Sequence, residues 1–260
     1  MRATVEGVRG LLANRLFIFV AVGVIAIGIA GALIAVSLVG SKSKKAAPTT
    51  VAPVALATTS TTSGRAKVPG AAATQQLFRG IPQKLNVLGR ANAPVTLIEF
   101  ADPQCPFCRE FTLNALPALV KDYVRPGKVK LVLLGIAFIG PESETALRAA
   151  YAAMLQNRLW NFLDLLYKNQ GDENSGWVTE GLLRSVGASI PGFDLPAMEA
   201  ARTGTDVTAA LQSSAQQAQK AAVNQTPTFF AGKTGSTVQP LNVKSLTADA
   251  FRPTLDALLK

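Results

Sequence analysis

Two cysteines, Cys105 and Cys108, are the only thiols of the chain, and two residues separate them. Proline is favoured at the first position of a helix, so we expect a helix that begins at Pro106, directly after Cys105. The unpaired amides at a helix start carry partial positive charge, which should stabilise a thiolate at Cys105 and lower its pKa. Cys108 would lie in the first turn, more buried and with a more ordinary thiol. This asymmetry suits thiol–disulfide exchange, in which one sulfur attacks and the other resolves the mixed disulfide.

The composition excludes several other chemistries. The chain has no histidine, which excludes Ser-His-Asp and Cys-His catalysis and histidine-ligated metals. Two cysteines cannot complete a four-ligand zinc or iron–sulfur site within one chain, although a metal shared between two chains stays open. A disulfide that closes so short a loop would contribute little as a structural crosslink. We therefore expect no metal and no bound cofactor beyond a redox-active Cys105–Cys108 disulfide.

The formal net charge of +10 is concentrated near the N-terminus. Residues 1–75 carry eight Lys and Arg and one acid, whereas residues 76–260 carry 18 Lys and Arg and 15 acids. No stretch of the second region interleaves basic and aromatic residues. We therefore do not expect a nucleic acid as a partner.

An apolar run at residues 16–39 contains 24 residues without a charge. As a helix it would span about 36 Å, enough to cross a hydrocarbon core of about 30 Å. We interpret it as an uncleaved signal anchor, although a cleaved signal peptide and a buried core helix are alternatives. Lys and Arg are balanced on its two sides, so they do not set its orientation. Residues 40–76, rich in Ala, Thr, Ser and Pro, are predicted to be a flexible linker.

From residue 77 onward, the pattern of apolar residues indicates an α/β domain. Strand, helix and strand in succession imply a parallel pair of strands. Proline and glycine mark the turns, and a long stretch carries apolar residues at helical spacing. We predict a strand at 95–100, a helix from 106 with a break near Pro117, a strand at 128–138, helices over 142–223, a strand after Pro227 and a closing helix at 247–259.

Several of these stretches, in this order, resemble the DsbA-like branch of the thioredoxin superfamily. The resemblance covers about residues 77–260. It implies a thioredoxin-like α/β fold with an all-helical insertion at about 141–223, here preceded by one transmembrane helix and a disordered linker. The stretches that carry it are Gly89–Val95, Ile98–Phe100, Cys105–Cys108, Asn161–Gln170 and Thr226–Phe230.

The resemblance also implies roles for particular residues. Cys105 would be the nucleophile and Cys108 the resolving thiol. Pro227 would follow a cis peptide bond, pack against the disulfide and, with Thr226, line the groove in which a substrate strand pairs through its backbone. The two residues between the cysteines, Pro106 and Phe107, would contribute to substrate binding. Because neither is a histidine, we expect the helix start and its backbone amides to be the main stabilisers of the Cys105 thiolate.

Glu99 is a candidate proton donor and acceptor. The related proteins place a buried acid at this position, where it moves the proton of the resolving cysteine. The physical argument is independent of the resemblance, because a carboxyl group buried in an apolar strand has a raised pKa and exchanges protons near neutral pH. The alternative is a glutamate at a strand end that reaches water.

The sequence thus predicts a protein disulfide oxidoreductase that passes its Cys105–Cys108 disulfide to thiols of secreted or membrane proteins. A quinone-linked membrane enzyme would reoxidise it. Stable disulfide oxidants function outside the cytoplasm, so residues 1–15 should be cytoplasmic and the catalytic domain extracytoplasmic. Two alternatives remain. One is a disulfide reductase or isomerase on the same scaffold, which Thr226 before Pro227 also suits, and the other is a non-catalytic, chaperone-like binding module.

Overall fold

The computed structural model describes residues 67–260. The predicted N-terminal segment (1–15), the predicted membrane span (16–39) and residues 40–66 of the predicted linker lie outside the described residues. The elements follow in the order α1 (Ala71–Phe78), β1 (Gln83–Lys84), β2 (Val87–Leu88), β3 (Val95–Ala101), α2 (Pro106–Asn114), α3 (Leu116–Leu119), the π-helical turn η1 (Val120–Val124), β4 (Val129–Gly135), α4 (Pro141–Leu155), α5 (Leu159–Lys168), α6 (Glu180–Ala188), α7 (Leu195–Ala201), α8 (Thr205–Lys220), β5 (Thr228–Lys233), β6 (Gln239–Pro240) and α9 (Ala248–Leu258).

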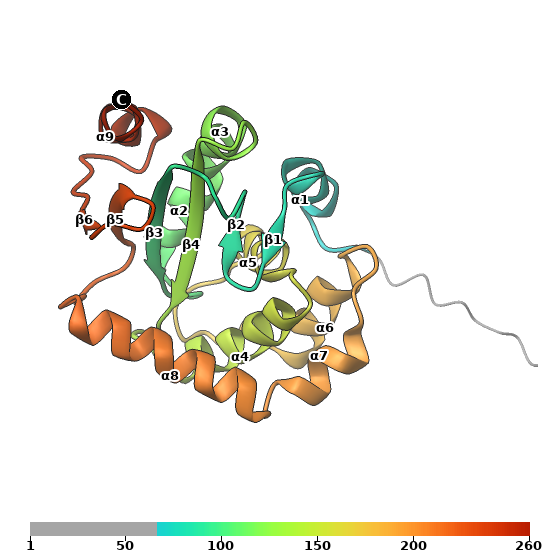
Figure 1. Ribbon diagram of the computed structural model, residues 1–260. Helices are drawn as coiled ribbons and strands as arrows, with labels where there is room; N and C mark the ends of the chain where they lie inside the picture. Colours follow the sequence, from blue (N-terminus) through green and yellow to red (C-terminus); the bar gives the residue numbers. More distant parts are fainter. Residues whose placement is uncertain (1–66) are drawn as a thin grey trace, which may run out of the picture. The chain divides into compact units, whose positions relative to one another are not determined.

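The described strands form one mixed sheet in the order β1-β2-β4-β3-β5-β6 (Figure 1). β3 and β4 are parallel, with Val95 opposite Val129, which confirms the predicted strand–helix–strand unit. β5 is antiparallel to β3 on its other side, and Phe100 lies opposite Thr228. The carboxyl end of β3 and the amino end of β5 therefore meet at one edge of the sheet. Residues that follow β3 and residues that precede β5 are brought together there.

The burial of the strands follows their sequences. β3 is buried along almost its whole length, as expected for a central strand covered on both faces. In the first half of β4 burial alternates, because the half-buried Lys130 lies between the buried Val129 and Leu131. β4 ends at Gly135 and not at residue 138 as predicted. A Cβ atom at Gly135 would lie 2.4 Å from the Leu147 side chain, so α4 packs directly on the strand end there.

Aromatic side chains join the helix after Cys105 to the sheet. Phe111 of α2, Phe229 of β5 and Phe251 of α9 pack together, with ring centroids 4.8 Å apart for Phe111–Phe229 and 4.9 Å for Phe229–Phe251. The next residue of β5, Phe230, packs edge-on against Phe100 in a second, smaller cluster. Successive strand residues face opposite sides of a sheet, so β5 contributes to the core on both faces.

The predicted break near Pro117 is observed between α2 and α3. α2 ends at Asn114, and α3 begins at Leu116 with Pro117 in its first turn. Proline is tolerated there because the first amides of a helix have no partner within the helix. The helix that begins directly after Cys105 is therefore short, and its start is held by the aromatic contacts of Phe111.

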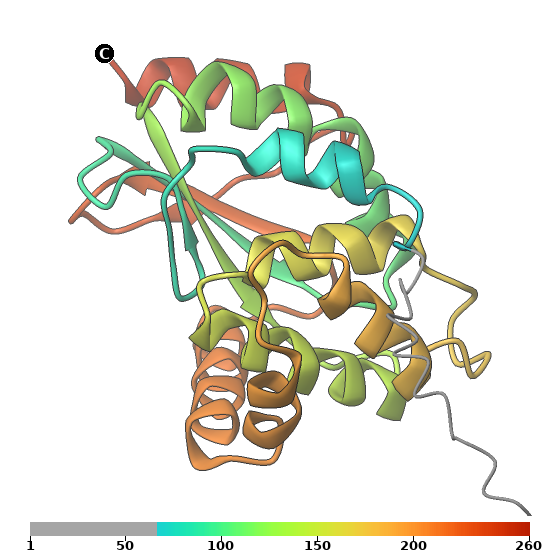
Figure 2. The same ribbon diagram turned by 90° about the vertical axis from the view of Figure 1, so that its right-hand side faces the viewer.

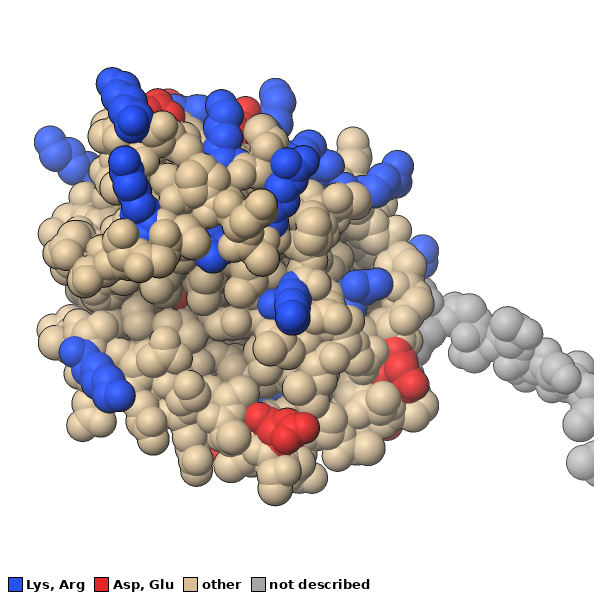
Figure 3. Space-filling view, viewed as in Figure 1, with Lys and Arg blue, Asp and Glu red and all other residues tan. Residues whose placement is uncertain are grey.

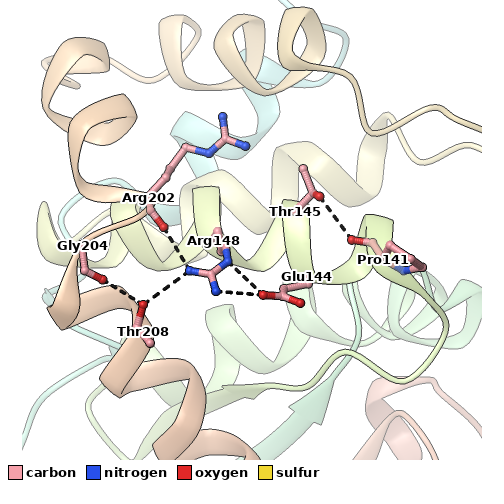
Figure 4. A network of polar contacts seen from close by, with 7 residues as sticks. All are labelled: Pro141, Glu144, Thr145, Arg148, Arg202, Gly204 and Thr208. Carbon is pink, nitrogen blue, oxygen red and sulfur yellow. Dashed lines mark hydrogen bonds and ion pairs between the residues drawn. The ribbon is translucent and has the colours of Figure 1, made fainter. Parts of the chain in front are cut away.

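The segment between β4 and β5 is helical, as predicted. It comprises α4 to α8. α4, α6, α7 and α8 form the lower part of the molecule in Figure 1, whereas α5 lies higher, behind the strands, where it contacts α1 and α2 (Figure 1 and Figure 2). Arg148 of α4 connects α4 to the segment around the start of α8 (Figure 4). Its guanidinium donates to the Arg202 carbonyl at 3.4 Å and to Thr208 Oγ1 at 3.5 Å. Glu144, one turn earlier, accepts from Arg148 Nε at 3.0 Å. The start of α8 is thereby held against α4.

The end of the predicted linker is corrected by the structure. Residues 71–76 were expected to belong to the flexible linker at 40–76, but they form most of α1. Ala71, Thr74 and Phe78 are buried, and the Thr74 hydroxyl donates to the buried carboxylate of Asp164 in α5. Lys168 binds the same carboxylate. The α1 segment has no strong apolar pattern of its own, so its composition suggested a linker. These contacts with α5 stabilise the helix instead.

None of the helices within residues 67–260 combines the length and the apolar character needed to cross a lipid bilayer. The predicted span at 16–39 lies outside this range.

Candidate active site

Cys105 occupies the cap position at the start of α2. Its backbone is extended, with φ −69° and ψ 120°, and Pro106 is the first helical residue, as predicted. The Cys105 residue is 4% exposed and Cys108 is fully buried, and both are free thiols. Pro106 is exposed, and Phe107 is 57% exposed. The two sulfurs thus lie at the helix start, while the residues between them face solvent.

The environment of Cys105 favours the thiolate. Its pKa is lowered to about 6, and the largest cause is a hydrogen bond from the Cys108 thiol. Burial opposes the shift, and the Thr226 hydroxyl and the backbone amides of Phe107 and Cys108 add to it. The direction agrees with the sequence analysis, but the main stabiliser differs. We expected the helix start and its amides to dominate. Instead the Cys108 side chain is the largest contributor to the lowered pKa, and Thr226, from a distant segment, precedes the amides.

Cys108 has the opposite character. Burial raises the pKa of its thiol well above the ordinary value, and the hydrogen bond it donates to Cys105 raises it further. The charges of Glu99 and Cys105 act in the same direction. The pair therefore contains one sulfur that ionises readily and one that retains its proton, and only Cys105 provides a nucleophile at neutral pH.

Glu99 lies in the middle of β3, opposite Leu133 of β4 and Phe229 of β5. It is 4% exposed, and its Oε1 atom has no hydrogen-bond partner among the described residues. Burial, with a smaller contribution from the Cys105 charge, raises the pKa of Glu99 to about 8. This burial rules out a glutamate that reaches water at a strand end. A carboxyl group with this pKa can give or take a proton near neutral pH.

The loop before β5 reaches Cys105 although it is more than a hundred residues away in the sequence. The Thr226–Pro227 peptide bond is cis. The thiol of Cys105 donates to the Thr226 carbonyl at 3.2 Å, so this loop forms one wall of the site. The register between β3 and β5 sets the contact, since Phe100 and Thr228 are paired at the strand ends next to the two loops.

Asp102 is a functional residue that the sequence analysis did not identify. It is fully buried, and its Oδ1 accepts from the Gln104 amide at 2.8 Å and from Ser143 Oγ at 2.6 Å. Its Oδ2 accepts from the amides of Phe138 at 2.7 Å and Ile139 at 3.0 Å. Asp102 thus holds the loop before Cys105 against the loop after β4. An acid directly after a buried strand and ahead of Pro103 was the available signal, because aspartate often accepts from the amide two residues later.

Two side chains at the end of α5 also hold this loop. Gln170 Nε2 donates to the carbonyls of Pro103 at 2.8 Å and Cys105 at 3.1 Å. The Tyr167 hydroxyl donates to the Asp102 carbonyl at 3.1 Å. Both residues lie within the stretch 161–170 that carried the resemblance. Their residue types and spacing did not predict these hydrogen bonds.

The surroundings of the site contain no candidate metal centre. Within residues 67–260, no three side chains of His, Cys, Asp or Glu gather closely enough to bind an ion. Apolar surface is exposed nearby, because Phe138, whose amide is bound by Asp102, is 50% exposed. The arrangement therefore provides two sulfurs, a buried acid and an accessible rim, which together are sufficient for thiol–disulfide exchange.

The family model described as thioredoxin matches residues 83–256. This chain belongs to the thioredoxin family. The chain is 33% identical over 146 residues to the probable disulfide bond formation protein D of Bacillus cereus, a match that covers 55% of this chain and 68% of the relative. It is 35% identical over 105 residues to disulfide bond formation protein D of Bacillus subtilis, with 40% of this chain and 47% of the relative covered.

Solved structures of similar fold include proteins of the same kind. The oxidised form of BdbD from Bacillus subtilis superposes with a TM-score of 0.59 at 26% identity, over 69% of this chain and 97% of that one. The α-DsbA1 structure of Wolbachia pipientis has a TM-score of 0.56 at 17% identity and covers 72% of this chain and 95% of that one, so it supports the fold alone. The chain is a DsbA-like protein disulfide oxidoreductase of the thioredoxin superfamily.

The Cys105 environment leads to a first prediction. In the reduced protein, the thiolate absorbance near 240 nm should rise with a midpoint near pH 6. Replacement Thr226→Val removes one hydroxyl donor, and we expect the midpoint to rise by roughly one pH unit, the effect of losing a hydrogen bond to a charged group. Thr228→Val is the matched control, because that hydroxyl donates to the Gln225 carbonyl and not to sulfur. A midpoint of pH 8 or higher in the unmodified protein would contradict the structure.

A second prediction concerns Glu99 and stability. Its pKa is about 8 in the folded protein and about 4.5 in an unfolded chain, so between these values only the folded state retains the proton. Stability should then fall as the pH rises, by about 1.4 kcal/mol per pH unit from this group. We expect the free energy of unfolding of Glu99→Gln, relative to the unmodified protein, to rise by about 2 kcal/mol or more between pH 5 and pH 7.

Urea unfolding of the reduced proteins at both pH values measures this difference. Glu110→Gln, at an exposed position of α2, is the control and should show no comparable change. A pH-independent difference between Glu99→Gln and the unmodified protein would show that Glu99 is ionised in the folded state.

Proposed function

We propose that the domain oxidises pairs of thiols in secreted or membrane proteins outside the cytoplasm, with a disulfide between Cys105 and Cys108 as the oxidant. The observation that carries the proposal is the contrast between the two sulfurs. Cys105 has a pKa of about 6, whereas the pKa of Cys108 is raised by burial. A stabilised Cys105 thiolate favours the reduced form of the protein, and a protein whose reduced form is stabilised is a strong oxidant.

The exchange proceeds in two steps. A substrate thiolate attacks the Cys105 sulfur, the Cys105–Cys108 bond breaks, and the Cys108 sulfur leaves and takes a proton from the Glu99 carboxyl group. A second substrate thiolate then attacks the substrate sulfur of the mixed disulfide, and Cys105 leaves as the thiolate. The substrate loses two electrons and gains a disulfide, while the protein becomes the dithiol. Glu99 supplies the proton because its pKa of about 8 keeps it protonated at neutral pH.

Substrate binding is assigned to the surface around Cys105. The Thr226 carbonyl already accepts a hydrogen bond from Cys105, so a substrate strand that pairs with the backbone of Thr226 and Pro227 would place its own sulfur beside Cys105. Pro106 and the exposed Phe107 would contact the substrate from the helix side. Backbone pairing accounts for many different substrates, because it does not depend on their side chains.

No bound cofactor is needed, since the electrons move between sulfur atoms alone. To act again, the dithiol must be reoxidised, and we assign this step to a quinone-linked enzyme of the membrane. The apolar residues 16–39 would hold the chain in that membrane with the domain on the extracytoplasmic side, where protein disulfides persist. The relatives named disulfide bond formation protein D support a role in making disulfides.

The reduction potential tests the direction of electron flow. We expect equilibration with glutathione to place the Cys105–Cys108 couple well above the value of about −270 mV typical of thioredoxin. The oxidised protein should also form a disulfide in a reduced two-cysteine peptide, and Cys105→Ser should abolish this reaction. A potential at or below that of thioredoxin would favour the reductase. Failure of the oxidised protein to form the peptide disulfide, with binding of unfolded chains that persists when both cysteines are replaced by serine, would favour a binding module.

Labelling in intact cells tests the location. After treatment with a membrane-impermeant reductant, a membrane-impermeant maleimide should modify Cys105 in cells that express the full chain. The label should be absent from Cys105→Ser, because Cys108 is fully buried. Labelling that occurs only after the cells are permeabilised would contradict an extracytoplasmic domain.

A further inference from the structure

Seven basic side chains lie around the end of the sheet opposite Cys105, where β3 and β4 begin. We call this surface the basic edge. Figure 3 shows Lys and Arg gathered over the upper part of the molecule, around α9 and the upper strand ends of Figure 1, and few acids among them. The seven residues of the basic edge are Arg79, Arg90, Lys121, Arg125, Lys128, Lys130 and Lys233.

Backbone pairing and side-chain contacts place four of these residues at the strand ends. Lys128 accepts a hydrogen bond on its carbonyl from the amide of Val95, the first residue of β3, and Lys233 lies opposite Val95 in the neighbouring strand. Lys130 Nζ donates to the Ala91 carbonyl at 2.9 Å. Arg90 lies against the turn before β4, since a Cβ atom at residue 127 would be 2.7 Å from its Cδ.

The remaining three residues extend the surface toward η1 and α1. Arg125 donates to the carbonyls of Arg79 and Leu77, at 2.8 Å each, which brings Arg79 beside it. Lys121 lies one turn before Arg125 along η1 and is exposed. The basic edge is therefore one continuous surface that several chain segments build.

The charge of the basic edge is not neutralised. Among residues 67–260, none of its seven side chains belongs to an ion pair. The nearby Asp122 and Asp249 are both bound by Arg252. The described chain has 19 Lys and Arg and 15 acids, so the rest of it carries 12 Lys and Arg against those 15 acids. The domain is therefore polarised, with positive charge at one end of the sheet.

The active site lies at the other end of the same strands. β3 has seven residues, which at about 3.3 Å per residue separates its two ends by roughly 20 Å. Acidic residues line the hollow beside the active site, where Asp172 and Glu173 lie with Gln104 and Arg109. A negatively charged surface that approaches the domain would bind the basic edge and leave Cys105 free.

We propose that the basic edge binds the anionic phospholipid surface of the membrane to which the chain is attached, so that Cys105 faces away from the bilayer. This inference rests on the membrane attachment proposed above. Clusters of this size bind anionic lipids within a Debye length, about 8 Å at physiological ionic strength. If residues 41–66 form the predicted coil, their 26 residues span roughly 25–30 Å on average, which keeps the bilayer within reach.

Hydrogen exchange of the full chain in lipid nanodiscs tests the proposal. Discs of phosphatidylcholine alone are compared with discs that also contain phosphatidylglycerol. We expect exchange in the loops at 89–94 and 125–128 to slow about threefold or more with phosphatidylglycerol, which corresponds to a docked population of two-thirds or more. Exchange at 102–108, around the cysteines, should not change, and high salt should reverse the slowing.

Charge-reversal variants identify the surface. Lys128→Glu with Lys233→Glu should abolish the slowing, whereas Lys67→Glu with Lys220→Glu should retain it. All four lysines are exposed, and none belongs to an ion pair within the described chain. Both double variants should keep the activity on a soluble two-cysteine peptide, because the four positions lie outside the active site.

The other outcomes overturn the proposal in distinguishable ways. Equal exchange in both kinds of disc, with the chain incorporated, overturns lipid binding and leaves the oxidase function intact. Slowing by a soluble polyphosphate but not by phosphatidylglycerol assigns the basic edge to an anionic polymer instead. A chain that elutes apart from the discs in size exclusion overturns membrane attachment itself, and lipid binding with it.

Discussion

The negative charge on the Cys105 sulfur is the interaction on which the rest of the site depends. Hydrogen bonds from Cys108, from Thr226 and from the amides at the start of α2 hold it, against the cost of burial. The donors come from two parts of the chain that only the sheet brings together. The pairing of β3 with β5 is therefore part of the chemistry as well as of the fold. A displaced Thr226 loop would remove one donor and one wall of the groove together.

The other groups of the site follow from that charge. A thiolate at Cys105 is useful as a leaving group only if Cys108 takes up a proton when the disulfide opens and then retains it, and burial in the first turn of α2 favours the protonated Cys108 thiol. Glu99 is buried in the adjacent strand and its pKa is raised mainly by burial as well, so in the proposed mechanism its carboxyl group holds the proton that Cys108 requires. Asp102 and Gln170 bind the loop before Cys105 on both sides and preserve the geometry that the donors require.

The two ends of the sheet differ in chemistry. At the carboxyl end of β3 the chain places sulfur, a buried acid and exposed aromatic side chains, and at the opposite end it places lysine and arginine. In the proposed function this separation is an advantage, because a basic surface beside Cys105 would select substrates by charge. The helical insertion lies near the catalytic end, where α5 contributes Tyr167 and the residues after it contribute Gln170.

The sequence by itself determined the elements whose signals are local: the apolar strands β3 and β4, the helix that starts at Pro106, and the pair of cysteines at that start. Its resemblance to known oxidoreductases added the Thr226–Pro227 loop and the helical insertion. Only the tertiary structure decided that residues 71–76 are helical, that Asp102 and Gln170 hold the active-site loop, and that the Cys108 thiol is the main stabiliser of Cys105. These features depend on contacts between residues distant in the sequence or on burial, and neither leaves a periodic or compositional signal in the segment concerned.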